Sequence, residues 1–315
     1  MNKCIAFHSY KGGTGKTTLA CNSAGVLTRK GYKVCLLDLD VYAPSFQSYF
    51  QREPRKGIND FLYSNAEAED IMLDITDIVS DMIADSGNGT NPSTSSQNNK
   101  LKKTGKLWIG FSNPQKKDTF SLEMATNETK RDAIRRFLHL RERLMSDYDA
   151  DYIIIDTSPG IRFWSINSLA MADVLLLTLK MGDLDIDGTK KVVEEIYRSL
   201  TKFGSKAFLV RNIISGYCVP HMFTNTNKNG SSSYRSSPST LSSSNNNRTI
   251  VQLQEEKEES TLDATASLSK EVGLEIVSSI PCYCDIQFLR KEFLTVLKYP
   301  QHPFAKQIEQ LVEML

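Results

Sequence analysis

The stretch HSYKGGTGKTTLA near the start of the chain is the feature that most constrains its fold. Three glycines, Gly12, Gly13 and Gly15, lie between an apolar run at residues 3–7 and a helix-forming segment at residues 16–31. Glycines let the backbone turn tightly enough for several N–H groups to point at one centre, and the start of the following helix adds positive potential. The order of strand, glycine loop and helix therefore predicts a phosphate cradle within an α/β fold.

The rest of the chain repeats this alternation of strand and helix patterns. Further apolar runs occupy residues 33–40, 107–111, 152–156, 174–179, 207–214 and 275–280. Continuous apolar runs are typical of strands buried on both faces of a parallel sheet. Helix-period segments at residues 130–148 and 188–203 separate several of them. The pattern predicts an α/β fold with a doubly wound, mostly parallel sheet flanked by helices and joined by right-handed crossovers.

Two segments break the alternation. Residues 86–106 and 224–250 are poor in large apolar side chains, and the second is mostly Ser and Asn. Such segments cannot bury enough surface to offset the entropy lost on ordering. We therefore expect one α/β domain over residues 1–315, carrying two flexible insertions.

The glycine loop also brings its own ligand-binding side chains. Lys16 can reach the outer phosphates of a nucleotide, and the Thr17 hydroxyl can bind Mg²⁺. The expected nucleotide-binding set is Gly12, Gly13, Thr14, Gly15, Lys16, Thr17 and Thr18. The general phosphate loop has glycine where this chain has Tyr10, and the neighbouring Lys11 is a second lysine that a simple cradle does not need.

The string KGGTGKTT resembles the deviant P-loop of the MinD/ParA/Mrp family of ATPases. In that family the lysine that matches Lys11 reaches the phosphates of the opposite subunit across a nucleotide sandwich. The resemblance implies a homodimer formed through the nucleotide face, with Lys11 and Lys16 both catalytic. A charge supplied by a partner subunit acts like an arginine finger and stabilises the transferring phosphoryl group.

Acidic residues follow two of the expected strands, at the edge where open α/β sheets bind ligands. The segment DLDVYAPS resembles the first switch of the family, which implies that Asp40 orients the attacking water and that Asp38 lies near the Mg²⁺ shell. The segment DYIIIDTSPG resembles the Walker B strand and second switch, which implies that Asp156 binds the metal.

Two short matches near the end of the chain concern the nucleotide base. The segment VRNII places Asn212 where many family members read adenine, and SSIPCYCDIQ places Pro281 at a turn that closes the base pocket. The resemblance implies ATP and Mg²⁺ as cofactors, and the choice of ATP over GTP depends on the resemblance alone.

The function implied is a Mg²⁺-dependent ATPase that dimerises on ATP and acts as a switch for positioning, partitioning or regulating another assembly through an unidentified protein partner. One alternative is an iron–sulfur cluster carrier, because Cys282 and Cys284 would point the same way on an extended segment. The other alternative is a binding module that holds nucleotide with little turnover.

Charge patterning does not support a DNA or membrane platform. The formal net charge is +1, and the final segment HPFAKQIEQLVEML pairs an apolar stripe with an acidic polar face, which favours docking on the core. Arg131, Arg135 and the basic run at residues 100–106 are expected to form solvated faces. The sequence contains neither a signal-peptide pattern nor a long apolar run, so we expect a cytoplasmic protein.

Overall fold

The computed structural model describes residues 2–63, 66–87, 104–113, 126–202, 204–214, 264–288 and 294–315. Its centre is an eight-stranded sheet with the order β3-β4-β2-β5-β1-β6-β7-β8. The strands are β1 (Lys3–His8), β2 (Lys33–Leu39), β3 (Met72–Asp74), β4 (Lys106–Gly110), β5 (Tyr152–Thr157), β6 (Val174–Leu179), β7 (Lys206–Ile214) and β8 (Ile276–Pro281). All neighbours pair in parallel except β3 and β4. The predicted fold class is confirmed.

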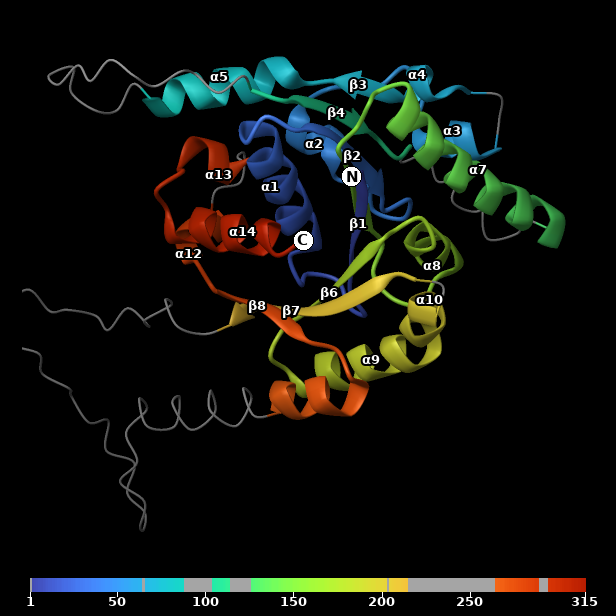
Figure 1. Ribbon diagram of the computed structural model, residues 1–315, viewed down its shortest axis with the longest axis vertical. Coiled ribbons are helices and arrows are strands. Elements are labelled where there is room, and N and C mark those ends of the chain that lie inside the picture. The colour runs from blue at the N-terminus through green and yellow to red at the C-terminus, as the bar shows by residue number, and fades with distance from the viewer. Residues whose placement is uncertain are drawn as a thin grey trace, which may run out of the picture.

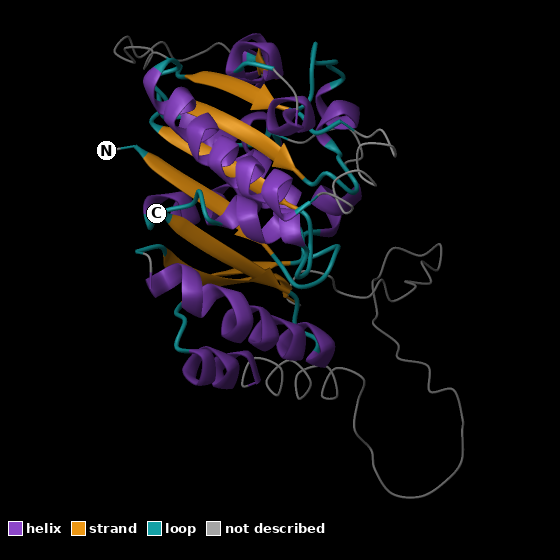
Figure 2. Ribbon diagram, turned by 90° about the vertical axis from the view of Figure 1, so that its right-hand side faces the viewer, coloured by secondary structure: helices purple, strands orange, loops and turns teal. Residues whose placement is uncertain are grey.

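Helices cover both faces of the sheet (Figures 1 and 2). One face carries α1 (Lys16–Arg29), α2 (Phe46–Phe50), α5 (Thr76–Gly87), α12 (Cys284–Phe288), α13 (Thr295–Lys298) and α14 (Pro303–Glu313). The other carries α3 (Ile58–Tyr63), α4 (Ala68–Ile71), α7 (Asn127–Ser146), α8 (Phe163–Leu169), α9 (Asp183–Val192), the π-helical turn η1 (Val193–Tyr197), α10 (Arg198–Lys202) and a helical segment over residues 264–272.

The two faces divide the core because successive side chains of a strand point to opposite sides. In β1, Ile5 and Phe7 belong to the apolar cluster beneath α1, whereas Cys4 and Ala6 belong to the cluster beneath α8 and η1. Burial on both faces explains why this strand reads as a continuous apolar run.

The sheet register brings the important strand ends to one edge. Asp38 of β2 lies beside Asp156 of β5, and Phe7 of β1 also pairs with Asp156. On the other side of β1, His8 pairs with Leu177 of β6. The loops that follow these strands therefore emerge together at the carboxyl edge.

The last helix docks as the sequence predicted. Phe304, Ile308 and Leu311 of α14 are buried, Glu309 forms an ion pair with Arg29 of α1, and Glu313 pairs with Lys30, which directly follows α1. Among the helices that the structure describes, none is long and apolar enough to cross a membrane.

The first predicted insertion differs from the structure at both of its ends. Residues 86–87 belong to the end of α5, and β4 begins at Lys106, so the ends of the segment 86–106 are parts of regular elements. Its interior and the whole segment 224–250 lie outside the described residues.

Candidate functional site

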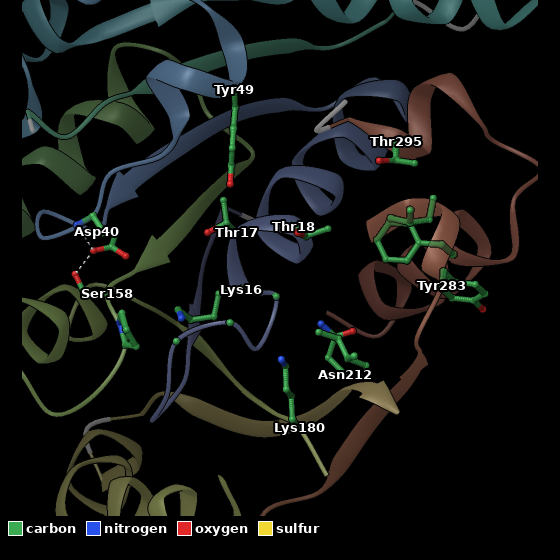
Figure 3. Close-up of a pocket in the computed structure, with 18 of the residues that line it drawn as sticks. Lys16, Thr17, Thr18, Asp40, Tyr49, Ser158, Lys180, Asn212, Tyr283 and Thr295 are labelled. Carbon is green, nitrogen blue, oxygen red and sulfur yellow. Dashed lines mark hydrogen bonds between the residues drawn. The ribbon is translucent and has the colours of Figure 1, made fainter. Parts of the chain in front are cut away.

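A pocket of about 850 Å³ opens at the carboxyl edge of the sheet (Figure 3). Nine of the residues predicted from sequence line it: Gly12, Gly13, Gly15, Lys16, Thr17, Thr18, Asp40, Asn212 and Pro281. The remaining four, Lys11, Thr14, Asp38 and Asp156, do not line it. The last three of these are buried next to the pocket-lining residues, as the contacts below describe.

The glycine loop depends on left-handed backbone at two positions. Gly13 has φ 74° and Gly15 has φ 88°, values that side-chain-bearing residues rarely adopt. At Gly15 there is also no room, because an added Cβ would lie 2.2 Å from Nδ2 of Asn212. Helix α1 begins at the next residue, so its free N–H groups face the pocket.

Lys16 is held at the pocket by an uncharged partner. Its Nζ donates a hydrogen bond of 2.9 Å to Oγ of Ser9, and that hydroxyl donates to the carbonyl oxygen of Lys11 at 2.5 Å. Burial lowers the pKa of Lys16, and the carboxylates of Asp156 and Asp40 oppose this effect. Because no carboxylate among the described residues contacts its ammonium group directly, the positive charge remains directed to an anionic ligand.

Thr17 and Asp156 form the part of the site suited to a metal. The Thr17 hydroxyl donates to Oδ2 of Asp156 at 2.6 Å, while Oδ1 of Asp156 is buried and has no hydrogen-bond partner among the described residues. Burial raises the pKa of Asp156 to about 7. A divalent cation would supply the missing partner and favour the ionised carboxylate, and Mg²⁺ prefers such oxygen ligands together with phosphates and water.

Asp38 holds the loop that follows β2. Its Oδ1 accepts a hydrogen bond from the Asp40 amide at 3.0 Å, and its Oδ2 accepts from the amides of Ser45 at 3.1 Å and Phe46 at 3.3 Å. Burial raises the pKa of Asp38, and the nearby charge of Asp156 adds to the increase. These contacts fix the loop geometry, and a place for Asp38 near the Mg²⁺ shell stays a prediction.

Asp40 joins the two loops that resemble switches. Its Oδ1 accepts hydrogen bonds from Oγ of Ser158 at 2.8 Å and from the Ala43 amide at 3.0 Å. Close by, the guanidinium carbon of Arg162 lies 4.1 Å from the ring centroid of Tyr42. Two contacts therefore connect the loop after β2 with the loop after β5.

Lys11 is half-buried and does not line the pocket of its own chain. The preceding residue, Tyr10, packs closely on Gly188 of α9, where an added Cβ would lie 1.9 Å from the Tyr10 ring. The predicted contact of Lys11 with a second subunit stays a prediction.

The opposite end of the pocket is mostly apolar. Pro281, Tyr283, Ile286 and Phe304 line it, which suits a flat heterocyclic group. Asn212 lies between this end and the glycine loop, and its Nδ2 donates to the carbonyl oxygen of Thr14 at 2.7 Å. Its predicted part in reading adenine stays a prediction.

The cysteine pair does not have the geometry that the cluster alternative required. Cys282 lies in the connection after β8 and Cys284 begins α12, so the segment is not an extended strand. The expectation of two parallel thiols is therefore wrong.

Comparison with known proteins places this architecture in a family. The family model described as an AAA domain matches residues 2–206. The fold also matches MinD complexed with Mg-ADP from Pyrococcus horikoshii OT3, with TM-score 0.60, 17% identity and coverage of 100% of this chain and 96% of that one. The chain belongs to the MinD/ParA family of P-loop ATPases.

Two further matches concern individual MinD/ParA relatives. The MinC:MinD cell division protein complex of Aquifex aeolicus matches with TM-score 0.63 and 15% identity over 99% of this chain and 95% of that chain. The iron–sulfur cluster carrier protein of the same species is 56% identical over 46 residues, which are 15% of this chain and 13% of that protein. The matches to the curated relatives thus span less than a third of their lengths.

Several pocket residues of this MinD/ParA chain were not predicted from its sequence. Ser9, Ser158, Tyr283 and Lys180 all contact or line the site. Ser158 stands two residues after the predicted Asp156, and Tyr283 two residues after Pro281, so proximity to those motifs was an available signal. Lys180 follows a strand without any motif, and only the sheet register brings it to the pocket.

Proposed function

We propose that this protein is a Mg²⁺-dependent ATPase that dimerises on ATP and works as a switch in positioning, partitioning or regulating another assembly. The observation that carries the proposal is the pocket itself, where Lys16, Thr17 and Asp40 line one space and buried Asp156 is hydrogen-bonded to Thr17. Phosphoryl transfer needs positive charge on the phosphates, a metal site and a group that orients the attacking water.

Each residue has a separate role in this proposal. Gly12, Gly13, Gly15 and the start of α1 bind the phosphates through backbone N–H groups, and Lys16 adds charge. When bound, Mg²⁺ would neutralise charge that develops on the phosphate oxygens, and Thr17 and Asp156 are the residues that would hold it.

Asp40 orients the attacking water through Oδ2, the oxygen to which no described residue donates a hydrogen bond. The support for this role is that Oδ1 is engaged by Ser158 and Ala43, which fixes the carboxylate at the pocket wall. Lys11 acts on the nucleotide of the second subunit, and its position outside the pocket of its own chain is compatible with this role.

Our proposal for the cellular role is based on the names of related proteins. Structural matches include a septum site-determining MinD, and a Helicobacter pylori relative that is 36% identical over 73 residues is a flagellum site-determining protein. We propose a corresponding role here, in the cytoplasm and with an unidentified protein partner.

The described part of the chain gives little support to DNA or a membrane as the binding partner. Arg141 pairs with Asp173, Arg143 with Glu69, and Arg135 with Asp132, so these arginines of α7 already have acidic partners. The cluster-carrier alternative loses the extended geometry on which it rested, because Cys284 begins α12.

Hydrolysis assays with purified protein test the proposal and separate it from a binding module. Lys16→Ala should abolish nucleotide binding, whereas Asp40→Ala should bind ATP, stop turning it over and accumulate as a dimer. Asp81→Ala, on the exposed side of α5, is the matched control and should behave as wild type. Equal hydrolysis by Asp40→Ala and wild type would contradict the role of Asp40.

Hydrolysis should also depend on protein concentration. If Lys11 acts across the subunit interface, the rate per chain should rise steeply as the protein is concentrated, and Lys11→Ala should remove this rise. A rate per chain that is constant over the same range would contradict the contribution of a second subunit.

A further inference from the structure

Lys180 is a lysine in the pocket that neither the motifs nor the proposed mechanism uses. It directly follows β6, which pairs with β1 so that His8 lies beside Leu177. It therefore emerges at the carboxyl edge next to the start of the glycine loop. Figure 3 shows its side chain pointing from the end of β6 toward the loop that carries Lys16.

The end of β6 is attached to the end of β1 and to the glycine loop. The hydroxyl of Thr178 donates to the carbonyl oxygen of His8 at 3.1 Å and lies 3.0 Å from the hydroxyl of Thr14. Thr178 stands two residues before Lys180, so the backbone from which Lys180 extends has a fixed position relative to the cradle.

The ammonium group of Lys180 lies close to the loop backbone. Its Nζ is 3.8 Å from the point that a Cβ on Gly13 would occupy, and Gly13 has a left-handed φ of 74°. Because Gly13 has no side chain, the space between its backbone and the ammonium group of Lys180 is open. Lys180 also lines the same pocket as Lys16 and Asn212.

Within the described residues, the Lys180 side chain has neither an ion pair nor a hydrogen bond. The lysines of the adjacent helix differ, because Lys190 pairs with Glu271 and Lys191 lies 3.8 Å from Glu195. An ammonium group without a counterion, facing a loop built for anions, is suited to an anionic ligand.

We propose that Lys180 binds the phosphate chain of the nucleotide in its own subunit, as a second ammonium group beside Lys16. The inference rests on the proposed nucleotide-binding function and adds a residue to that site. A charge-assisted hydrogen bond of this kind should change nucleotide affinity by about tenfold or more.

Equilibrium titration with fluorescently labelled ATP and ADP, and with adenosine as competitor, tests this residue. Lys180→Met should weaken binding of both nucleotides by about tenfold and leave adenosine unchanged, and added salt should weaken binding by the variant less than by wild type. Lys180→Arg should retain most of the affinity. Lys191→Met is the matched control and should bind as wild type.

The outcomes separate this inference from the function on which it rests. If wild type binds labelled ATP and Lys16→Ala does not, but Lys180→Met binds within twofold of wild type, the Lys180 assignment is overturned and the ATPase proposal stands. If wild type binds no nucleotide, both are overturned. Titration at a concentration where sedimentation shows a monomer tests the subunit assignment, because an effect that appears only in the dimer would overturn it.

Discussion

The contact between Gly15 and Asn212 gives the most quantitative prediction. In Gly15→Ala, the new Cβ would lie 2.2 Å from Nδ2 of Asn212, and φ at this position is 88°. The backbone cannot escape the left-handed conformation without losing the cradle, so the amide of Asn212 must move. When it moves, the 2.7 Å hydrogen bond to the Thr14 carbonyl is lost.

The magnitude follows from two separable costs. Left-handed backbone at a residue with a Cβ costs about 1 kcal/mol. Losing the Asn212 hydrogen bond and leaving the carbonyl of buried Thr14 without a partner costs about 2 kcal/mol. We expect about 3 kcal/mol for Gly15→Ala and about 2 kcal/mol for Asn212→Ala. The double variant should lose only about 3 kcal/mol rather than 5, because the hydrogen bond can be lost only once.

Urea unfolding of the four nucleotide-free proteins measures this coupling of about 2 kcal/mol. In a protein that already carries Asn212→Ala, the further substitution Gly15→Ala should lower the free energy of unfolding by only about 1 kcal/mol, instead of about 3 kcal/mol in wild type. If the two substitutions add to within about 0.5 kcal/mol, the side chains do not compete for one space and the reasoning fails.

Three further predictions concern the surroundings of the cradle. Burial lowers the pKa of His8 to about 3, so the folded protein keeps His8 neutral while the unfolded chain protonates it near the ordinary value of 6.5. As the pH falls below 6.5, wild type should lose about 1.4 kcal/mol of unfolding free energy per pH unit relative to His8→Gln. Parallel plots of unfolding free energy against pH for the two proteins would contradict this. Thr17→Ala should reduce the gain in ATP affinity on adding Mg²⁺ by about tenfold while Thr17→Ser retains it, and an unchanged gain would remove Thr17 from the metal site. Arg162→Met should speed hydrogen exchange of residues 41–45 by about two- to fivefold by removing the contact with Tyr42; unchanged exchange would show that the contact does not hold the loop.

The sheet could be predicted because its strands are buried on both faces. The runs at residues 152–156 and 174–179 are almost entirely apolar, and both became central strands. The edge strand Met72–Asp74 was not predicted, because three residues with one exposed side carry too little pattern. The segment after Pro281 turned into α12 rather than continuing the strand, since a short stretch does not separate the two periods.

The site could be predicted as far as the motifs extend. Glycine spacing, Lys16 and Thr17 indicated the cradle, and Asp40 followed from its place at a strand end. The partners of these residues depend on sheet register and side-chain packing. Ser158 reaches Asp40 only because β2 and β5 are neighbours, and no local pattern encodes that pairing.

The glycine loop is fastened from three sides, by Thr178, by Asn212 and by the amide of Gly160, which donates to the Ser9 carbonyl. A loop tied in this way has little freedom left to lose when phosphate arrives, and little capacity to deform in response. In the proposed mechanism, a shape change that follows the nucleotide would then involve its neighbours, the segments after β2 and β5. In the proposed switch, substitutions in these two segments would therefore alter the response to nucleotide more than its binding.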